Sequence, residues 1–575
     1  MPRFIGFYLN ETGKGILEEL RGILPGLEVF PLKKGILEEN WQRGTVFLFV
    51  MATGIVVRMT ARFLKDKRSD PGVIVISEDR KWVIPLLGGH SAETNALSKK
   101  ISDYLGSNSV VTTASDTKGL TPLDNWIRKR ELKVKNPELL PRVMGSFRNK
   151  GFLKVWRDEV FKSALFPEAE EVKSPEGAEV LLTNKTLGDL SKQLVLIVPS
   201  LWVGIGLHEW VNKEDVEAAV REVLSRSGLC FEAIKGVATI DKKLEVKGLK
   251  EFCSEYSFEI KGFSKEELSK VKEVKGSSQV EKAVGTPSVS EASAILASRG
   301  KLLVGKRIFK DITLAIGEEP YSRKGKLWVV GTGPGGIEHL SLKALSALRE
   351  AEVIVGYKTY LSLVKPLIST KACYSYGMTE EVKRAKQAVK MALSGFDVAV
   401  VSGGDPGIYG MAALVLEVLA VNHIKDLRVE VIPGISALNA CAALAGSPLT
   451  TDFAVISLSD RLTPWEEIEK RLKAFASLDI PIVIFNPRSK SRQEHLSKAL
   501  AVLTSHRTED VPVAVITSAT REDEKVILTN LGSVKAEEVG MSSLLIIGCS
   551  SSFRFLNWLI TPRGYRKKYG KDLSF

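Results

Sequence analysis

The chain of 575 residues is too long for one hydrophobic core, and at roughly 150 residues per domain it predicts three to five domains. Its 44% hydrophobic and 26% charged residues are typical of a globular protein and exclude a disordered or fibrous one. The net charge of +13 favours an anionic partner (nucleic acid, an acidic membrane or a small polycarboxylate), but it fits a merely solubilising surface equally well.

No targeting or metal-binding pattern is evident. No run of about 18 uncharged apolar residues predicts a membrane span, and the start MPRFIGFYLNETGKG is unlike a signal peptide, so we expect a cytoplasmic protein. The five cysteines and six histidines are scattered, without C-x-x-C or H-x-x-x-H spacing. We therefore expect neither a disulfide framework nor a metal held by the protein itself.

Apolar runs rich in β-branched residues alternate with amphipathic helices, which predicts an α/β fold of several domains with mostly parallel sheets. The run GEEPYSRKGK is polar and carries Gly and Pro, which is typical of a linker. The expected parts are domains at 1–125, 126–199 and 200–318, a linker at 319–325, and a C-terminal half at 326–575 with subdomains of about 326–445 and 446–575.

In the first domain, IPLLGGHSAETN places His90 after a buried strand, at the mouth of a helix. A histidine there can polarise or deprotonate a ligand group, helped by the positive end of the helix, but it can equally be a hydrogen-bonded turn residue. Asp116, in VVTTASD after the next strand, could face the same crevice. No G-x-S-x-G elbow occurs, so the sequence does not indicate a serine acyl-enzyme.

In the C-terminal half, the strand KLWVVG leads into GTGPGG, which formally satisfies G-x-G-x-x-G. We reject a dinucleotide site because Pro334 removes an N–H from the turn and no acidic residue follows the next strand; alone, the loop fits a tight strand-to-helix turn. Two more strands end in SGGDPGIYGMA and IPGISALNACAALAG. Because ligands bind at the carboxyl ends of such strands, we expect the loops around Gly333, Asp405 and Ser436 to converge on one crevice.

Two later segments carry polar side chains. LSDRLTPWEEIEKRL contains Ser459 and Asp460, and it predicts a helix capped by Thr463. FNPRSKSR places Arg488, Lys490 and Arg492 just after a strand, and guanidinium groups pair bidentately with carboxylates. This run suits a grip on a polycarboxylate substrate; a solvated basic loop is the alternative.

The motifs GTGPG, SGGDPGIYGMA, PGISA, SLSDRLTPW, FNPRSKSR and TPRGY, in this order over about residues 325–566, resemble the tetrapyrrole methylases. More narrowly, they resemble precorrin-3B or cobalt-factor-III C17-methyltransferase. The resemblance implies a two-domain fold with S-adenosylmethionine in its cleft, and methylation with ring contraction of cobalt-factor III or cobalt-precorrin-3B to cobalt-precorrin-4. The implied cofactor positions are Gly333, Pro334, Gly404, Asp405, Ile408, Ser436, Ala437, Asn486 and Ala514. For the ring contraction that the resemblance implies, Ser459 and Asp460 are the candidates to assist proton transfer. Members of this family are commonly dimers, which leaves a homodimer open.

The motifs TGIVVR, IPLLGGH with Asn95, VVTTASD, ATIDKKLEVKGL, GTPSVSEASAIL and LLVGKRIFKDITLAIG resemble cobalt-precorrin-5A hydrolase over about residues 1–317. This implies opening of the lactone of cobalt-precorrin-5A to give cobalt-precorrin-5B and acetaldehyde, with cobalt carried by the substrate. Leu207 and His208 stand where that family usually has Cys-Arg, so a thiol is not essential here. The candidate catalytic residues of this half are His90, Asn95, Asp116, Glu291 and Lys306.

Two alternatives remain open. Other proteins with the methylase fold modify RNA or the diphthamide precursor, although this half lacks aromatic residues interleaved with basic ones, so we expect no nucleic-acid partner and no membrane partner. The N-terminal half could also be a non-catalytic corrinoid-binding module, which would explain why it shows no obvious nucleophile.

Overall fold

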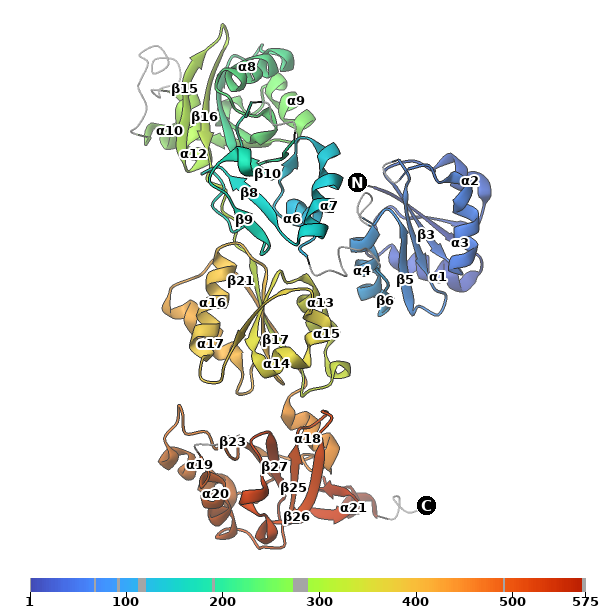
Figure 1. Ribbon diagram of the computed structural model, residues 1–575, viewed down its shortest axis with the longest axis vertical. Coiled ribbons are helices and arrows are strands. Elements are labelled where there is room, and N and C mark those ends of the chain that lie inside the picture. The colour runs from blue at the N-terminus through green and yellow to red at the C-terminus, as the bar shows by residue number, and fades with distance from the viewer. Residues whose placement is uncertain are drawn as a thin grey trace. The chain divides into compact units, whose positions relative to one another are not determined.

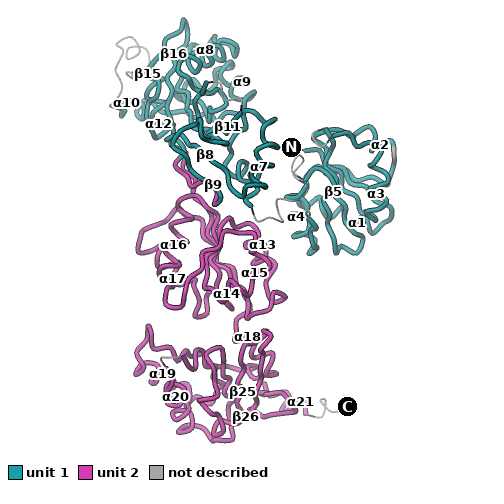
Figure 2. The backbone as a smooth tube through the Cα atoms, in the orientation of Figure 1, with its two compact units in different colours: residues 1–161, 168–321 teal, residues 162–167, 322–575 magenta. Residues whose placement is uncertain are grey.

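The computed structural model describes residues 2–66, 69–89, 94–111, 120–188, 192–271, 288–489 and 492–570. The chain divides into two compact units (Figure 2). Unit 1 holds residues 1–161 and 168–321, and unit 2 holds residues 162–167 and 322–575. The finer division into domains stays a prediction.

Unit 1 begins with a six-stranded sheet in the order β2-β1-β3-β4-β5-β6, parallel except between β4 and β5. Its central strand β3 is buried along its whole length, as expected for a continuous apolar strand covered on both faces. The elements are β1 (Arg3–Tyr8), α1 (Glu11–Leu20), β2 (Glu28–Pro31), α2 (Lys34–Glu39), β3 (Thr45–Val50), α3 (Thr53–Thr60), η1 (Ala61–Phe63), β4 (Gly72–Ile76), β5 (Trp82–Leu87), α4 (Thr94–Leu105) and β6 (Asn108–Ser109).

The charge-rich middle segment forms a sheet of its own, in the order β7-β11-β10-β8-β9. Only β7 pairs in the antiparallel sense. The elements are α6 (Leu123–Lys129), β7 (Lys133–Val134), η2 (Pro137–Leu139), α7 (Leu140–Lys150), β8 (Leu153–Arg157), β9 (Ala169–Glu171), η3 (Pro175–Gly177), β10 (Val180–Thr183) and β11 (Leu194–Ile197).

The third sheet of unit 1 has the order β14-β13-β12-β16-β15, with β16 antiparallel to both of its neighbours. Helix α12 packs directly on β12, because a Cβ added at Gly204 would lie 1.9 Å from the carbonyl oxygen of Ser290. The elements are β12 (Leu201–Leu207), α8 (Lys213–Arg226), η4 (Phe231–Ala233), β13 (Ile234–Ile240), η5 (Asp241–Lys243), α9 (Lys247–Tyr256), β14 (Glu259–Phe263), α10 (Lys265–Ser269), α12 (Val289–Ser298), β15 (Lys301–Ile308) and β16 (Ile312–Glu318).

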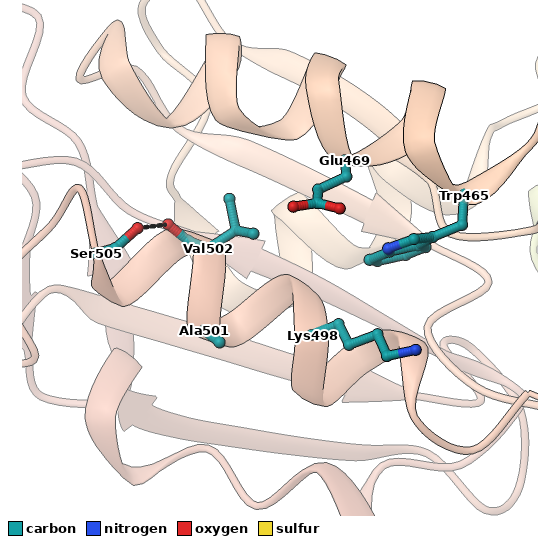
Figure 3. Close-up of a pocket in the computed structure, with 6 residues that line it drawn as sticks. All are labelled: Trp465, Glu469, Lys498, Ala501, Val502 and Ser505. Carbon is teal, nitrogen blue, oxygen red and sulfur yellow. Dashed lines mark hydrogen bonds between the residues drawn. The ribbon is translucent and has the colours of Figure 1, made fainter.

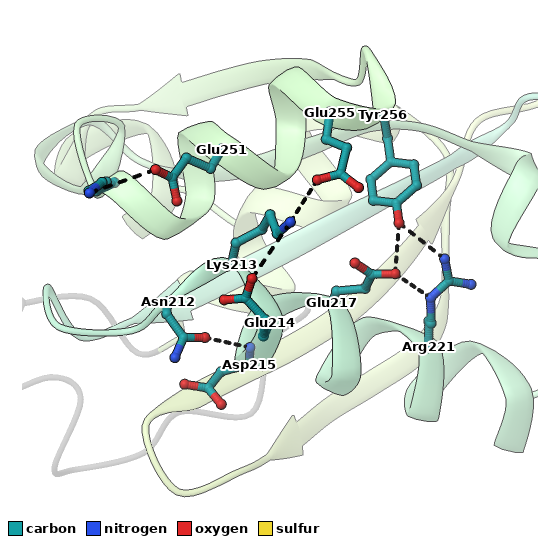
Figure 4. A network of polar contacts seen from close by, with 10 residues as sticks. Asn212, Lys213, Glu214, Asp215, Glu217, Arg221, Glu251, Glu255 and Tyr256 are labelled. Atoms are coloured by element: carbon teal, nitrogen blue, oxygen red, sulfur yellow. Dashed lines mark hydrogen bonds and ion pairs between the residues drawn. The ribbon is translucent and has the colours of Figure 1, made fainter.

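Polar side chains join helices α8 and α9 of this part (Figure 4). Lys213 pairs with Glu255 at 2.8 Å, and the Tyr256 hydroxyl donates to Glu217 at 2.7 Å. Arg221 also donates to Glu217, at 2.7 Å. Such partly exposed pairs contribute less than about 1 kcal/mol each, so we regard this cluster as structural.

Unit 2 opens with a wholly parallel sheet in the order β19-β18-β20-β17-β21. Helices α16 and α17 cover one face, and α13, α14 and α15 cover the other (Figure 1). The elements are β17 (Lys326–Gly331), η6 (Ile337–His339), α13 (Leu342–Glu350), β18 (Val353–Tyr357), α14 (Lys358–Leu363), α15 (Lys365–Ile368), β19 (Ala372–Tyr376), α16 (Glu381–Leu393), β20 (Val398–Ser402), α17 (Met411–Val421) and β21 (Arg428–Ile432).

The second sheet of unit 2 has the order β23-β24-β27-β25-β26, in which only β23 and β24 are parallel. A small third sheet has the order β22-β29-β28, in which β22 precedes β23 along the chain and β28 and β29 follow β27. The elements are α18 (Ala437–Ala445), β22 (Gly446–Ser447), β23 (Ala454–Ser457), α19 (Trp465–Ser477), β24 (Ile482–Phe485), α20 (His495–Thr504), β25 (Pro512–Thr517), β26 (Lys525–Asn530), η7 (Leu531–Ser533), η8 (Ala536–Glu538), β27 (Ser543–Ile547), β28 (Phe553–Phe555), β29 (Trp558–Ile560) and α21 (Tyr565–Tyr569).

The predicted cap of α19 is wrong. The helix begins at Trp465, its N-cap position is Pro464, and no side chain caps it. With ψ of 149°, Pro464 is non-helical and occupies the N-cap position, so Thr463 lies one residue before the position from which a side chain caps a helix.

Candidate active site

Three loops of unit 2 leave the same edge of one sheet. β17 lies between β20 and β21, and all three are parallel, so their carboxyl ends are neighbours. The loops that follow carry Gly333, Asp405 and Ser436. This edge is where open α/β sheets bind ligands.

Main-chain hydrogen bonds join the first two loops. The Gly404 N–H donates to the Gly333 carbonyl at 2.7 Å, and the Gly333 N–H donates back to the Gly404 carbonyl at 3.2 Å. Both glycines have positive φ, +65° at Gly404 and +74° at Gly333, which residues with a Cβ rarely adopt. The third loop approaches so closely that a Cβ on Gly434 would lie 2.3 Å from the Gly404 oxygen.

The Asp405 carboxylate fastens the second loop to the third. Its Oδ2 accepts the Gly434 N–H at 3.1 Å, and its Oδ1 accepts the Gly407 N–H at 2.8 Å. Ser436 then caps α18, since its hydroxyl accepts the Leu438 N–H at 3.1 Å. The first turn of α18 therefore begins beside the loops, and its positive end can interact with an anionic or electron-rich group.

Other predicted cofactor positions lie close to these three loops. Ala437 is the first residue of α18, and its N atom would lie 3.5 Å from a Cβ placed on Gly404. The Pro334 carbonyl accepts from Arg521 Nε at 3.2 Å, and the Ile408 side chain is 41% exposed. An exposed apolar side chain beside main-chain polar groups fits a ligand with both apolar and polar parts.

The ends of β23 and β24 contribute a second group of residues. Asn486 donates through Nδ2 to the Ser457 hydroxyl at 2.9 Å, and the Ser459 N–H donates to the same oxygen at 3.2 Å. The Tyr409 ring, from the loop that carries Asp405, packs against Phe485 with ring centroids 5.3 Å apart. Within unit 2, Tyr409 thus links the loop cluster to the β23 and β24 ends.

Asp460 lies beside two groups that can carry positive charge. His495 Nε2 is 3.0 Å from Asp460 Oδ2, and Arg492 Nε is 3.6 Å from Oδ1. The His495 ring meets Trp465 edge to face, with centroids 4.7 Å apart. No sequence pattern pointed to His495, because it begins helix α20 and does not follow a strand motif. An Asp–His pair is a recurrent general acid–base arrangement.

The arginines of the basic segment already donate hydrogen bonds to main-chain carbonyls of the protein. Arg488 donates to the carbonyl of Glu537 at 2.6 Å, and Arg492 donates to that of Leu458 at 2.8 Å. Burial lowers the pKa of Arg492, although Asp460 opposes this effect. Lys490 lies outside the described residues. The two arginines hold loops in place, and only their remaining N–H groups can grip a substrate.

Ala514 lies in the sheet rather than in the loops. It pairs with Leu528 on one side and Ile546 on the other, and its exposed fraction is 0%. It packs in the same cluster as Ala437, beneath the start of α18. Its contribution to a ligand site is therefore limited to supporting that helix.

A groove of about 440 Å³ runs between α19 and α20 (Figure 3). None of the predicted site residues lines it, although Trp465 at one end also touches His495. The lining residues are Trp465, Glu469, Lys498, Ala501, Val502 and Ser505.

In unit 1, the structure brings together two of the predicted residues. Glu291 Oε1 accepts the backbone N–H of Lys306 at 3.0 Å, at the start of α12, where Ser288 is the N-cap. His208 stacks on the exposed Trp210, with centroids 4.5 Å apart, directly after β12. We did not predict this exposed pair as a site.

The first sheet carries one described candidate. Asn95, in α4, lies against the loop after β5, because a Cβ on Gly89 would be 2.9 Å from its Oδ1. His90 and Asp116 lie outside the described residues. In the described part of the chain, no group of three or more His, Cys, Asp or Glu could hold a metal ion, and no helix is long and apolar enough to cross a membrane.

Comparison with known families covers most of this architecture. Residues 326–535 match the tetrapyrrole (corrin/porphyrin) methylases. Residues 35–116 and 201–317 match the N-terminal and C-terminal models of cobalamin synthesis G. A probable cobalt-factor III C(17)-methyltransferase of Salmonella typhimurium is 44% identical over 42% of this chain and 99% of its own length. The chain belongs to the tetrapyrrole methylase family.

Other relatives of this tetrapyrrole methylase differ in length. A cobalt-factor III methyltransferase of Priestia megaterium is 47% identical over 43% of this chain, and the chain spans only 46% of that protein. The crystal structure of the methyltransferase CobJ is 33% identical and covers 41% of this chain and 100% of its own, with a TM-score of 0.40.

Proposed function

We propose that the tetrapyrrole methylase half transfers a methyl group from S-adenosylmethionine to C17 of cobalt-factor III or cobalt-precorrin-3B, with ring contraction to cobalt-precorrin-4. The observation that carries this proposal is the joining of three carboxyl-edge loops by the Gly333–Gly404 and Asp405–Gly434 hydrogen bonds. The name of the Salmonella typhimurium relative supports the choice of substrate.

The chemistry requires alignment more than a strong base. When bound, S-adenosylmethionine would supply an electrophilic methyl group. Gly333, Gly404 and the start of α18 present main-chain groups that would orient it, and Ile408 would exclude water from one side. Asp460 and His495, at 3.0 Å, could move a proton during ring contraction, and free N–H groups of Arg488 and Arg492 could hold substrate carboxylates.

We further propose that the N-terminal half hydrolyses the lactone of cobalt-precorrin-5A, giving cobalt-precorrin-5B and acetaldehyde. The two cobalamin synthesis G matches support this assignment. His90, Asn95 and Asp116 are the candidates from the first part of the chain, whereas Glu291 lies in α12 and Lys306 in β15. Because Glu291 already accepts a backbone N–H, we assign it a positioning role.

The remaining expectations stay part of this proposal. Cobalt would be carried by the substrate and not by the protein, the partners would be cobalt-bound polycarboxylate tetrapyrroles, and the working compartment would be the cytoplasm. A homodimer and the domain limits at 125, 199 and 318 also remain predictions.

One anaerobic assay tests both activities. The purified full chain is incubated with cobalt-factor III and S-adenosylmethionine, and products are identified by mass spectrometry. A gain of one methyl group with ring contraction supports the methylase proposal, and an unchanged mass rejects it. When cobalt-precorrin-5A is supplied instead, the wild-type protein should release acetaldehyde. The His90→Ala variant should release none but should still methylate cobalt-factor III. Asp405→Ala should show the reverse pattern, so each variant controls for the other.

A further inference from the structure

Arg384 is a buried arginine whose side chain has no partner among the described residues. It lies in the first turn of α16 and is only 5% exposed. Its Nε has no hydrogen-bond partner, and its guanidinium forms no ion pair with any residue that the structure describes. A partly desolvated guanidinium without a protein partner is costly, and a bound anion would relieve that cost.

The position of Arg384 is next to the methylase loops. Helix α16 leads into the parallel strand β20, so its N-terminal turn lies at the carboxyl edge of the sheet. Tyr357 ends β18 at this same edge, and its ring meets that of Tyr360 with centroids 5.4 Å apart. The Tyr360 ring lies against the loop that precedes Asp405, because a Cβ on Gly403 would be 2.5 Å from it.

The charges of Arg384 and Arg521 both act on the Tyr360 hydroxyl. Burial lowers the pKa of Arg384, while Glu381 and then Tyr360 oppose this effect. Burial also raises the pKa of Tyr360, opposed by the positive charges of Arg521 and Arg384. Two cationic groups therefore act on one phenol hydroxyl, and that hydroxyl has no hydrogen-bond partner among the described residues.

Carboxylates of the chain do not satisfy this charge. Glu380 already accepts the Gly377 N–H at 2.8 Å and pairs with Lys383 at 3.2 Å. Glu381 precedes Arg384 by less than one turn but forms no ion pair with it within the described ranges. Arg521 uses Nε to bind the Pro334 carbonyl, and its terminal N–H groups make no other hydrogen bond with described residues.

We propose that Arg384, Tyr360 and Arg521 form a binding site for a peripheral carboxylate of the tetrapyrrole substrate. This inference rests on the methylase function proposed above. Guanidinium N–H groups and a phenol O–H are all donors, which suits a carboxylate, and the neighbouring cofactor loops would place the bound macrocycle next to the methyl donor. The site differs from the basic loop at Arg488 and Arg492, so the macrocycle would be held at two points.

The test uses uroporphyrin III, an octacarboxylate tetrapyrrole, as the probe for the full chain, with binding followed by fluorescence quenching. We expect Arg384→Met to weaken binding about ten- to a hundredfold, as the loss of charge-assisted hydrogen bonds does. Arg384→Lys should weaken it less. Lys386→Met removes one charge from an exposed position of the same helix and should change affinity less than about twofold.

A second measurement separates binding from structural support. Without ligand, Arg384→Met should unfold at the same temperature as wild type or higher, because it replaces an unpaired buried charge with an apolar chain. S-adenosylhomocysteine binding should stay unchanged. Equal probe affinity for Arg384→Met and Lys386→Met, or a marked loss of thermal stability in Arg384→Met, would overturn the carboxylate site alone. If wild-type protein binds S-adenosylhomocysteine but not uroporphyrin III, the proposed substrate fails together with the site.

Discussion

Asp405 Oδ2 accepts the backbone N–H of Gly434 at 3.1 Å, and this bond joins loops that follow two different strands. Its other oxygen accepts the Gly407 N–H, so the carboxylate acts on the shape of the loops. A carboxylate that accepts backbone N–H groups contributes about 1.5–3 kcal/mol per bond.

Replacing this carboxylate should disrupt the joined loops. We expect Asp405→Ala to weaken S-adenosylmethionine binding at least about tenfold, because two N–H donors lose their acceptor and the loops separate. Isothermal titration calorimetry measures the change. Asp426→Ala, at an exposed carboxylate of the same unit, should bind normally; equal affinity for the two variants would show that Asp405 does not shape the cofactor site.

Because the loops approach so closely at Gly434, adding one methyl group there should disrupt them. Gly434→Ala would place a Cβ 2.3 Å from the Gly404 oxygen and 2.8 Å from the Gly331 carbonyl carbon, both rigid backbone atoms. We expect a loss of about 1–3 kcal/mol of unfolding free energy, as overpacking causes, together with loss of cofactor binding. Gly540→Ala meets only Ser543 Oγ at 3.8 Å and should be neutral in denaturant titrations. Equal stability of the two variants would contradict the loop geometry.

The pair of His495 and Asp460 should affect turnover more than binding. We expect His495→Ala and Asp460→Asn each to lower kcat for ring contraction by about 10²–10⁴, with little change in S-adenosylmethionine affinity. Since the two residues act together, the double variant should be no slower than either single variant. His506→Ala, just beyond the same helix, is the matched control; multiplicative losses would show that the two act independently.

Glu430 predicts a measurable pH dependence of stability. Hydrogen bonds from Lys343 and Lys326 lower its pKa from 4.5 to about 2. Because the folded-state pKa is depressed, the stabilisation is complete above about pH 4.5 and is lost as the pH falls toward 2. Glu430→Gln should therefore cost about 1 kcal/mol at neutral pH after allowance for solvent screening, and the difference from wild type should shrink in acid. Urea unfolding across this range tests it, with the exposed Glu417→Gln as control; a difference that is constant with pH would contradict it.

The strand-loop architecture of unit 2 was predictable from sequence because continuous apolar strands and glycine-rich loops are local signals. KLWVVG, DVAVVS and VEVIP all form neighbouring strands, so the convergence of their loops followed from the parallel arrangement. The mainly antiparallel order of the last sheet did not follow, because no local pattern specifies which strands pair.

Residues that act through distant contacts were harder to predict. His495 meets Asp460 across 35 positions, and nothing in the sequence links them. Arg384 precedes the buried Ala388 by four residues, so the two lie on the same face of α16. In the charged run EEVKRAKQ, however, Arg384 is one of several charged residues that are expected to face solvent. Its burial was therefore detectable in principle from helical spacing. The roles of Glu291 and Lys306 also depended on the fold, since their contact uses a backbone N–H.

The reciprocal bonds between Gly333 and Gly404 involve no side chain. Loops joined through main-chain groups alone do not select which acceptor molecule is methylated. The side chains around them can therefore change while the methyl donor is still bound in the same way. Changes in which macrocycle is modified could then arise by altering those side chains, without the evolution of a new way to hold the alkylating reagent.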